Sequence, residues 1–127
     1  MRLLLDTHAF LFAIAEPDRL PKRLHTWLLD PEVERWVSVV SLWEIAVKVQ
    51  IGKLNLPLDR EFYDLHLRSL GANVLPVDLR HSLTLFGLPL HHRDPFDRLL
   101  IAQAVEEGLT IASRDDSFRS YAVETVW

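Results

Sequence analysis

Three short apolar stretches in this chain each run into a polar turn that opens a helix, and this pattern restricts the fold more than any other feature. The stretches lie in LLLDTHAFL, SVVSLWEIAVK and LTIASRDDSF. Strands that alternate with helices favour an α/β fold with a mostly parallel sheet covered on both faces. In such a sheet the carboxyl ends of the strands gather at one edge, and ligands bind there.

The spacing of apolar residues, prolines and glycines predicts where each element lies. We expect strands at Arg2–Leu5, Trp36–Val40, Asn73–Val77, Leu109–Ala112 and Val123–Val126. We expect helices at Thr7–Ala15, Pro21–Leu29, Ser41–Ile51, 60–70 (capped by Asp59), Leu79–Phe86 and Asp94–Glu107, a short one near Asp116–Ser120, and a loop at Leu88–Arg93.

Length and composition limit the possible protein classes. A chain of 127 residues predicts one domain, spanning residues 1–127, with a single core. The absence of cysteine excludes disulfides and thiolate metal sites, and is compatible with a cytoplasmic location. The net charge of −4 argues against a general nucleic-acid coating protein.

The apolar N-terminus contains Asp6 and His8, so we interpret it as a strand followed by a helix, and not as a signal peptide. No stretch of the sequence approaches transmembrane length.

Acidic residues stand at or near the predicted junctions between strands and helices. Asp6, Glu44 and Asp115 belong to the three stretches above, and the pair Asp94 and Asp97 begins the helix in HHRDPFDRLLIAQA. Carboxylates brought to one edge of a sheet repel each other unless a cation neutralises them. Hard oxygen ligands suit Mg²⁺ or Mn²⁺. The arrangement therefore predicts a divalent metal and chemistry on a phosphate.

Each acid also has a purely structural interpretation. Ser41 and Glu44 have the spacing of a capping box, in which the serine caps a helix and the glutamate reaches back to it. Asp94 can cap the helix that begins at Pro95, and Asp97 would then favour the positive end of the helix dipole. These interpretations are compatible with metal binding, because a helix start presents a first-turn carboxylate toward the crevice.

The remaining two acids differ in how well structure alone explains them. Asp115 fits an ordinary turn or helix cap. Asp6 is harder to explain, because a carboxylate at the centre of a sheet costs several kcal/mol unless it is paired or metal-bound.

The order and spacing of these motifs resemble the PIN-domain family, and specifically the VapC-type toxin ribonucleases of type II toxin–antitoxin modules. The resemblance runs from MRLLLDTHAFLF through VSVVSLWEIAVKVQIGKL and LPLHHRDPFDRLLIAQAVEEGLTIASRDDSF to the closing ETVW. It implies a three-layer α/β/α sandwich and Mg²⁺- or Mn²⁺-dependent endonucleolytic cleavage of RNA. It also implies a homodimer that is inhibited by a cognate VapB-like antitoxin.

Carried over position by position, the resemblance implies a role for each acid. The catalytic and metal-binding acids of the family fall on Asp6, Glu44, Asp97 and Asp115. Asp94 is an additional acid of this branch and shares a helix face with Asp97, so either can hold metal, and we favour Asp97. The expected supporting residues are the hydroxyls of Thr7 and Ser113, which orient carboxylates, and Asp116, which ranks behind Asp115.

The expected mechanism is hydrolysis of an RNA phosphodiester by metal-activated water. One or two ions, held by Asp6, Asp97 and their neighbours, polarise the phosphate and lower the pKa of a bound water. Glu44 and Asp115 hold further waters or a second ion. The candidate contacts to RNA phosphate are His91, His92, Arg93, Arg98 and Arg114.

Two other functions compete with the nuclease. A phosphatase of the haloacid dehalogenase type would need Asp-x-Asp after the first strand, but this chain has Asp6-Thr7-His8 there. The second alternative is a non-catalytic PIN-like module that binds RNA or a protein. The presence of all the acids and the absence of a broad basic patch count against it.

Overall fold

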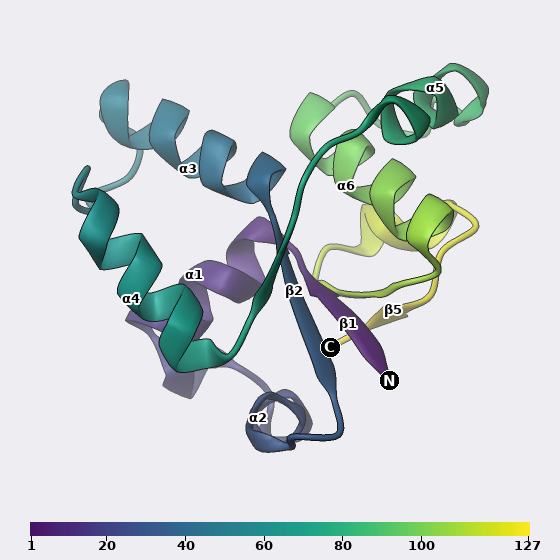
Figure 1. Ribbon diagram of the computed structural model, residues 1–127. Helices are drawn as coiled ribbons and strands as arrows, with labels where there is room; N and C mark the ends of the chain where they lie inside the picture. Colours follow the sequence, from purple (N-terminus) through teal and green to yellow (C-terminus); the bar gives the residue numbers. More distant parts are fainter.

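The strand β1 (Arg2–Leu5) is the centre of the sheet in the computed structural model, which describes residues 1–127 (Figure 1). The five strands follow the order β3-β2-β1-β4-β5, and all four neighbouring pairs are parallel. The other strands are β2 (Glu34–Ser38), β3 (Asn73–Leu75), β4 (Thr110–Ala112) and β5 (Thr125–Val126). The predicted parallel α/β architecture is confirmed, with every pair parallel.

Helices connect successive strands, as parallel strands require. They are α1 (Thr7–Ala15), α2 (Lys22–Leu29), α3 (Val39–Gln50), α4 (Arg60–Leu70), α5 (Leu79–Gly87) and α6 (Pro95–Glu107), with short 3-10 helices η1 (Pro17–Arg19) and η2 (Asp116–Ser120). In Figure 1 the helices α1, α3 and α4 lie to the left of the sheet, α2 lies near its lower end, and α5 and α6 lie to the right. None of these helices has the length and apolar character needed to cross a membrane.

Side chains of β1 alternate between two apolar cores, one on each face of the sheet. Leu3 and Leu5 belong to the core beneath α1, which includes Phe10. Leu4 points to the opposite face and packs in the core beneath α6, which includes Leu100. Burial on both faces explains why this strand is continuously apolar and why it takes the central position.

The second strand ends two residues before its predicted end. The sequence predicts a strand over Trp36–Val40 and a helix from Ser41, but the strand ends at Ser38 and α3 begins at Val39. Ser38 caps this helix, because its hydroxyl accepts a hydrogen bond of 3.0 Å from the N–H of Val40. The predicted capping box of Ser41 and Glu44 is therefore wrong. Both residues lie within α3, after its first turn has begun, and both are buried in the protein.

Helix α6 is held in place by a buried amide. Gln103 accepts a hydrogen bond of 2.5 Å from the Ser38 hydroxyl and donates one of 3.2 Å to the Pro76 carbonyl. These contacts tie the middle of α6 to the carboxyl ends of β2 and β3. The helix ends at Gly108, whose φ of +67° suits glycine and turns the chain back into β4. The start of α6 is thereby fixed at the carboxyl edge of the sheet.

Candidate active site

Asp6 follows the central strand directly and is almost fully buried. Its backbone N–H donates to the Ala112 carbonyl of β4, at 3.1 Å, so the residue lies between the carboxyl ends of β1 and β4. Its side chain caps α1 by accepting a 2.7 Å hydrogen bond from the N–H of Ala9. Burial raises the pKa of Asp6, although the Ser113 hydroxyl and the Ala9 N–H favour its charged form.

Glu44 is buried in α3 and faces the start of α1. The Thr7 hydroxyl donates a 2.6 Å hydrogen bond to Glu44 Oε1, and the hydroxyl oxygens of Thr7 and Ser41 lie 3.0 Å apart. Lys48, one helical turn further along α3, donates to the other carboxylate oxygen of Glu44. Both oxygens of this carboxylate therefore have fixed partners, which hold it in one orientation.

The start of α6 carries the two acids that the sequence predicts there. Asp94 caps the helix, because its Oδ1 accepts a 2.9 Å hydrogen bond from the N–H of Asp97, and Pro95 occupies the first helical position. This confirms the predicted helix start. Asp97 itself lies in the first turn with its side chain 19% exposed.

Asp115 and its neighbour Asp116 both follow β4, but their side chains have different partners. Asp115 caps η2 through a 2.9 Å hydrogen bond from the Ser117 N–H, which lowers the pKa of Asp115. Ser113 is buried, and its hydroxyl accepts a 3.0 Å hydrogen bond from the Asp115 N–H. Asp116 is 86% exposed and pairs with Arg119 at 3.2 Å, so its side chain turns away from the other acids.

The five acids act electrostatically as one cluster, which we call the acid cluster. Burial, followed by the charges of Asp94, Glu44, Asp6 and Asp115, raises the pKa of Asp97 to about 8. Burial and the four neighbouring carboxylates act on Asp97 in the same direction, and together they keep its proton in place near neutral pH. The tertiary structure has therefore brought together side chains from α1, α3, α6 and the end of β4, which is the grouping that the sequence predicts.

Lys48 is the cation of the acid cluster, and the sequence-based predictions did not include it. Burial disfavours its charged form, but the hydrogen bond and charge of Glu44, with the charges of Asp94 and Asp97, raise the pKa of Lys48. The signal for this residue was present, because Glu44 and Lys48 are four residues apart on a predicted helix and such pairs are neighbours. One lysine cannot neutralise five carboxylates, so the cluster still favours a cation.

The predicted RNA-contact residues have different surroundings. His91, Arg93 and Arg114 are exposed, whereas His92 and Arg98 are partly buried. Arg98 donates to the Pro89 and Leu88 carbonyls at 2.8 and 3.2 Å, so it holds the loop before α6 in place. Its guanidinium is already engaged within the protein, which makes it a poor candidate for a phosphate ligand.

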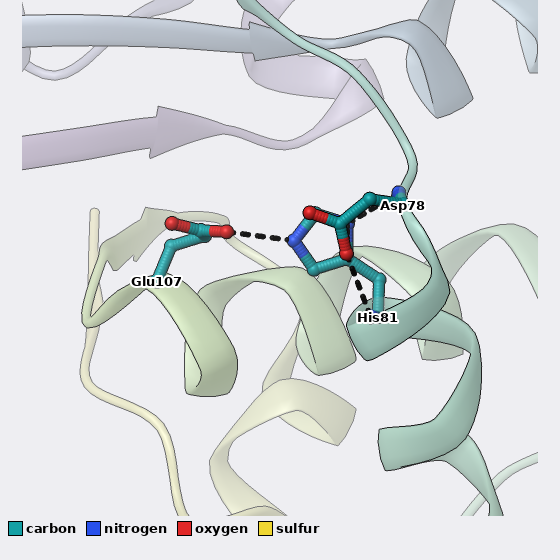
Figure 2. A group of neighbouring side chains, drawn as sticks. All are labelled: Asp78, His81 and Glu107. Atoms are coloured by element: carbon teal, nitrogen blue, oxygen red, sulfur yellow. Dashed lines mark hydrogen bonds and ion pairs between the residues drawn. The ribbon is translucent and has the colours of Figure 1, made fainter.

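A second polar cluster lies at the other end of α6. Asp78, His81 and Glu107 bring ligand atoms within 4.8 Å of one another, a closer grouping than any three members of the acid cluster make, and Figure 2 shows the imidazole between the two carboxylates. It lies ten residues along α6 from Asp97, which corresponds to about 15 Å of helix. The sequence-based predictions did not include it.

This second cluster already has its own partners. His81 Nδ1 accepts a 3.0 Å hydrogen bond from the backbone N–H of Asp78, so its Nε2 carries the proton that faces Glu107 at 2.9 Å. Arg80 lies 3.2 Å from Asp78 and 2.9 Å from Glu107 and supplies the positive charge. We therefore interpret these residues as a capping network that joins α5 to the end of α6.

Comparisons with known proteins agree on one family. The sequence profile of the PIN domain matches residues 3–124. The ribonuclease VapC22 of Mycobacterium tuberculosis is 29% identical over 131 aligned positions, which cover 98% of each chain. Among solved structures, VapBC2 from Rickettsia felis, bound to a DNA fragment from its promoter, superposes with a TM-score of 0.74 at 16% identity, over 99% of this chain and 98% of that one. DNA-bound VapBC from Salmonella typhimurium gives 0.70 at 14%, over 99% and 97%.

The raised pKa of Asp97 predicts how pH changes the stability of the metal-free protein. Between about pH 4 and pH 8 the folded protein keeps a proton on Asp97, whose pKa is about 8, while the unfolded chain has lost it. The free energy of unfolding should therefore fall as pH rises through this range, by at most about 1.4 kcal/mol per pH unit. An Asp97→Asn variant should show a flatter profile and be more stable at pH 8 by about 1–3 kcal/mol.

Urea unfolding in EDTA at several pH values between 5 and 8 measures these profiles. The matched control is Asp116→Asn, since Asp116 is exposed and faces away from the acid cluster. Parallel profiles for the wild type and Asp97→Asn would contradict the prediction, because they would show that the pKa of Asp97 is not raised in the folded protein.

Proposed function

Because the chain belongs to the PIN domain family, we propose that it is a VapC-type toxin that cleaves RNA as a metal-dependent endoribonuclease. The observation that carries this proposal is the acid cluster at the carboxyl edge of a parallel sheet, where ligands bind in such folds. The similarity to the ribonuclease VapC22 supports the choice of RNA as the substrate. We also propose a cytoplasmic location, because the proposed RNA substrate is found there.

The donors of the acid cluster fit a small divalent ion. All are carboxylate oxygens, which suit Mg²⁺ or Mn²⁺, and Mg²⁺ keeps several of its waters, so few direct protein ligands are needed. Asp6 and Asp97 are the proposed direct ligands, with Glu44, Asp94 and Asp115 around them. An ion held there would supply positive charge beside the scissile phosphate and favour ionisation of an attacking water.

Residues of the chain perform the remaining tasks. Thr7 orients Glu44 by its hydrogen bond of 2.6 Å, and Ser113 joins Asp6 to Asp115 through its hydroxyl. Lys48 lowers the repulsion among the acids and keeps a positive charge next to Glu44. Such contacts fix ligand orientation before substrate arrives, which is how surrounding residues support a metal site.

RNA would approach across the exposed cations beside the acid cluster. Arg114 lies over the ring of Phe12 at 5.0 Å and, with His8, lines a groove of about 460 Å³ between α1 and the segment that follows α3. His91 and Arg93 are exposed on the loop before α6. The arginines present positive charge and the imidazole rings present flat surfaces, both of which favour contact with a single RNA strand.

Cleavage of end-labelled total RNA by the purified protein tests the proposed activity. We expect discrete products in Mg²⁺ or Mn²⁺ and none in EDTA. Asp6→Asn should reduce the rate at least a hundredfold, because the amide keeps the cap on α1 but loses the charge. Asp115→Asn should also reduce the rate, whereas Asp116→Asn should not, since only Asp115 belongs to the acid cluster.

Metal-dependent cleavage that survives Asp6→Asn in a folded protein would contradict the proposed site. RNA binding by the wild type without turnover in any metal would instead favour a non-catalytic PIN-like module.

A VapB-like antitoxin is the proposed protein partner. Support comes from the solved structures of similar fold, which are VapBC complexes. An apolar groove of about 360 Å³ lies between α3 and α4, and its lining includes Leu42, Leu58 and Leu67. An amphipathic segment of an antitoxin would fill such a groove with its apolar side chains.

Placing a charge on the rim of this groove should weaken antitoxin binding. Leu58 is 59% exposed, so Leu58→Glu should leave the fold intact. We expect at least a tenfold loss of affinity for the cognate VapB-like antitoxin, measured by titration of the purified proteins. Leu65→Glu is the control, because Leu65 is equally exposed on α4 but does not line the groove. Equal affinity of both variants would place the antitoxin elsewhere.

A homodimer is the second proposed assembly, and its candidate interface is the outer face of α5. Leu79, Leu83 and Phe86 are spaced four and three residues apart, so they share one face of the helix, and they are 71%, 54% and 89% exposed. Leu90, in the following loop, is 68% exposed. An exposed apolar stripe of this kind is typical of a protein–protein contact.

Phe86→Glu should convert a dimer into a monomer without unfolding it, because the ring makes little contact with its own chain. Light scattering after size-exclusion chromatography gives the mass of each species directly. Leu65→Glu again serves as the control and should keep the mass of the wild type. A wild type that is monomeric at all concentrations, or a dimer that survives Phe86→Glu, would exclude this interface.

A further inference from the structure

His92 lies beside the acid cluster with one ring nitrogen that no hydrogen bond satisfies. Its Nε2 atom is buried and has no hydrogen-bond partner. The nearest carboxyl group is that of Asp97, whose Oδ2 lies 3.7 Å away. A buried polar atom without a partner is uncommon and calls for a physical explanation.

The other nitrogen of the ring is fixed by Tyr121, which is buried behind the loop. The tyrosine hydroxyl accepts hydrogen bonds from the guanidinium of Arg98 at 3.1 Å and from the backbone N–H of His92 at 3.2 Å. Both of its lone pairs are then in use, so its own proton is left for His92 Nδ1, 2.7 Å away.

This arrangement determines which tautomer the imidazole adopts. A ring that accepts at Nδ1 carries its proton on Nε2 when it is neutral. The Asp97 carboxyl oxygen nearest to this N–H lies about 0.5 Å beyond the length of an ordinary hydrogen bond. Arg98 also holds the loop through two carbonyls, so the ring is oriented from several sides.

We propose that His92 is a positioning residue, which uses its Nε2–H to orient the Asp97 carboxylate for the metal ion. The inference rests on the proposed function, because it concerns the ion that the acid cluster would hold. A hydrogen bond from His92 would hold one oxygen of Asp97 and leave the other for the ion, which is how carboxylate ligands in metal sites are oriented. His92 thereby leaves the set of RNA-contact candidates, and Tyr121 and Arg98 become its supports.

Its neighbour His91 provides a matched control. The His91 ring packs edge-on against the same tyrosine, with ring centres 4.8 Å apart, but it is exposed and no charged group is paired with its nitrogens. A variant at His91 therefore changes the same loop and the same aromatic contact without changing the group that faces Asp97.

Calorimetric titration of the RNA-free protein with Mn²⁺ tests the proposal independently of cleavage. His92→Phe keeps a ring but removes both nitrogens, and should weaken Mn²⁺ binding about ten- to a hundredfold. His92→Gln places an amide N–H close to the position of Nε2 and should recover much of this loss. His91→Phe should bind as the wild type does. Thermal unfolding in EDTA, measured for each variant, reports any separate loss of stability.

An unchanged Mn²⁺ affinity in a folded His92→Phe protein would overturn the proposal, and a loss of stability alone would make His92 a packing residue. Should His92→Phe fail to fold, Tyr121→Phe replaces it, since this change removes the hydroxyl that fixes the tautomer. Wild-type affinity in that variant would likewise overturn the proposal. A wild type that binds no Mn²⁺ would overturn the proposed metal site as well, which separates the two failures.

Discussion

The repulsion among carboxylates at one edge of the sheet is the constraint on which the rest of the structure depends. Asp6 occupies the buried end of the central strand, and its neighbours in space come from three further segments of the chain. Charged groups in such a place are costly unless something compensates them. The fold tolerates them because helix N–H groups, hydroxyls and Lys48 each stabilise one of the carboxylates. A divalent ion would neutralise the negative charge that these contacts leave.

The two ends of α6 show how differently acids are used in one protein. At its end, Glu107 pairs with the imidazole of His81 and with Arg80, which also pairs with Asp78, so both carboxylates have partners within the chain. At its start, Asp97 has a pKa of about 8 and only one lysine in the surrounding cluster. Ligand atoms lie closer together at the end of the helix, but there they already have partners within the chain.

The helix caps and the acid cluster use the same residues. Asp6, Asp94 and Asp115 each accept a hydrogen bond from the first turn of the helix that follows. A capping carboxylate must lie at a helix start, and in a parallel sheet many helix starts lie at the carboxyl edge. An acid at such a helix start can therefore cap the helix and also face a metal ion. For this reason the sequence alone left both interpretations open.

The sequence by itself determined the alternation of strands and helices, the central apolar strand and the acids at the junctions, because periodicity and capping are local properties. It did not determine that Ser38 caps α3. The Ser38 hydroxyl accepts a hydrogen bond from the N–H of Val40 and donates one to the buried amide of Gln103, which is distant in the chain. It also did not determine that Lys48 lies near Asp94 and Asp97, or that His81 meets Glu107. Those features join residues far apart in the chain, and only tertiary packing decides which of them meet.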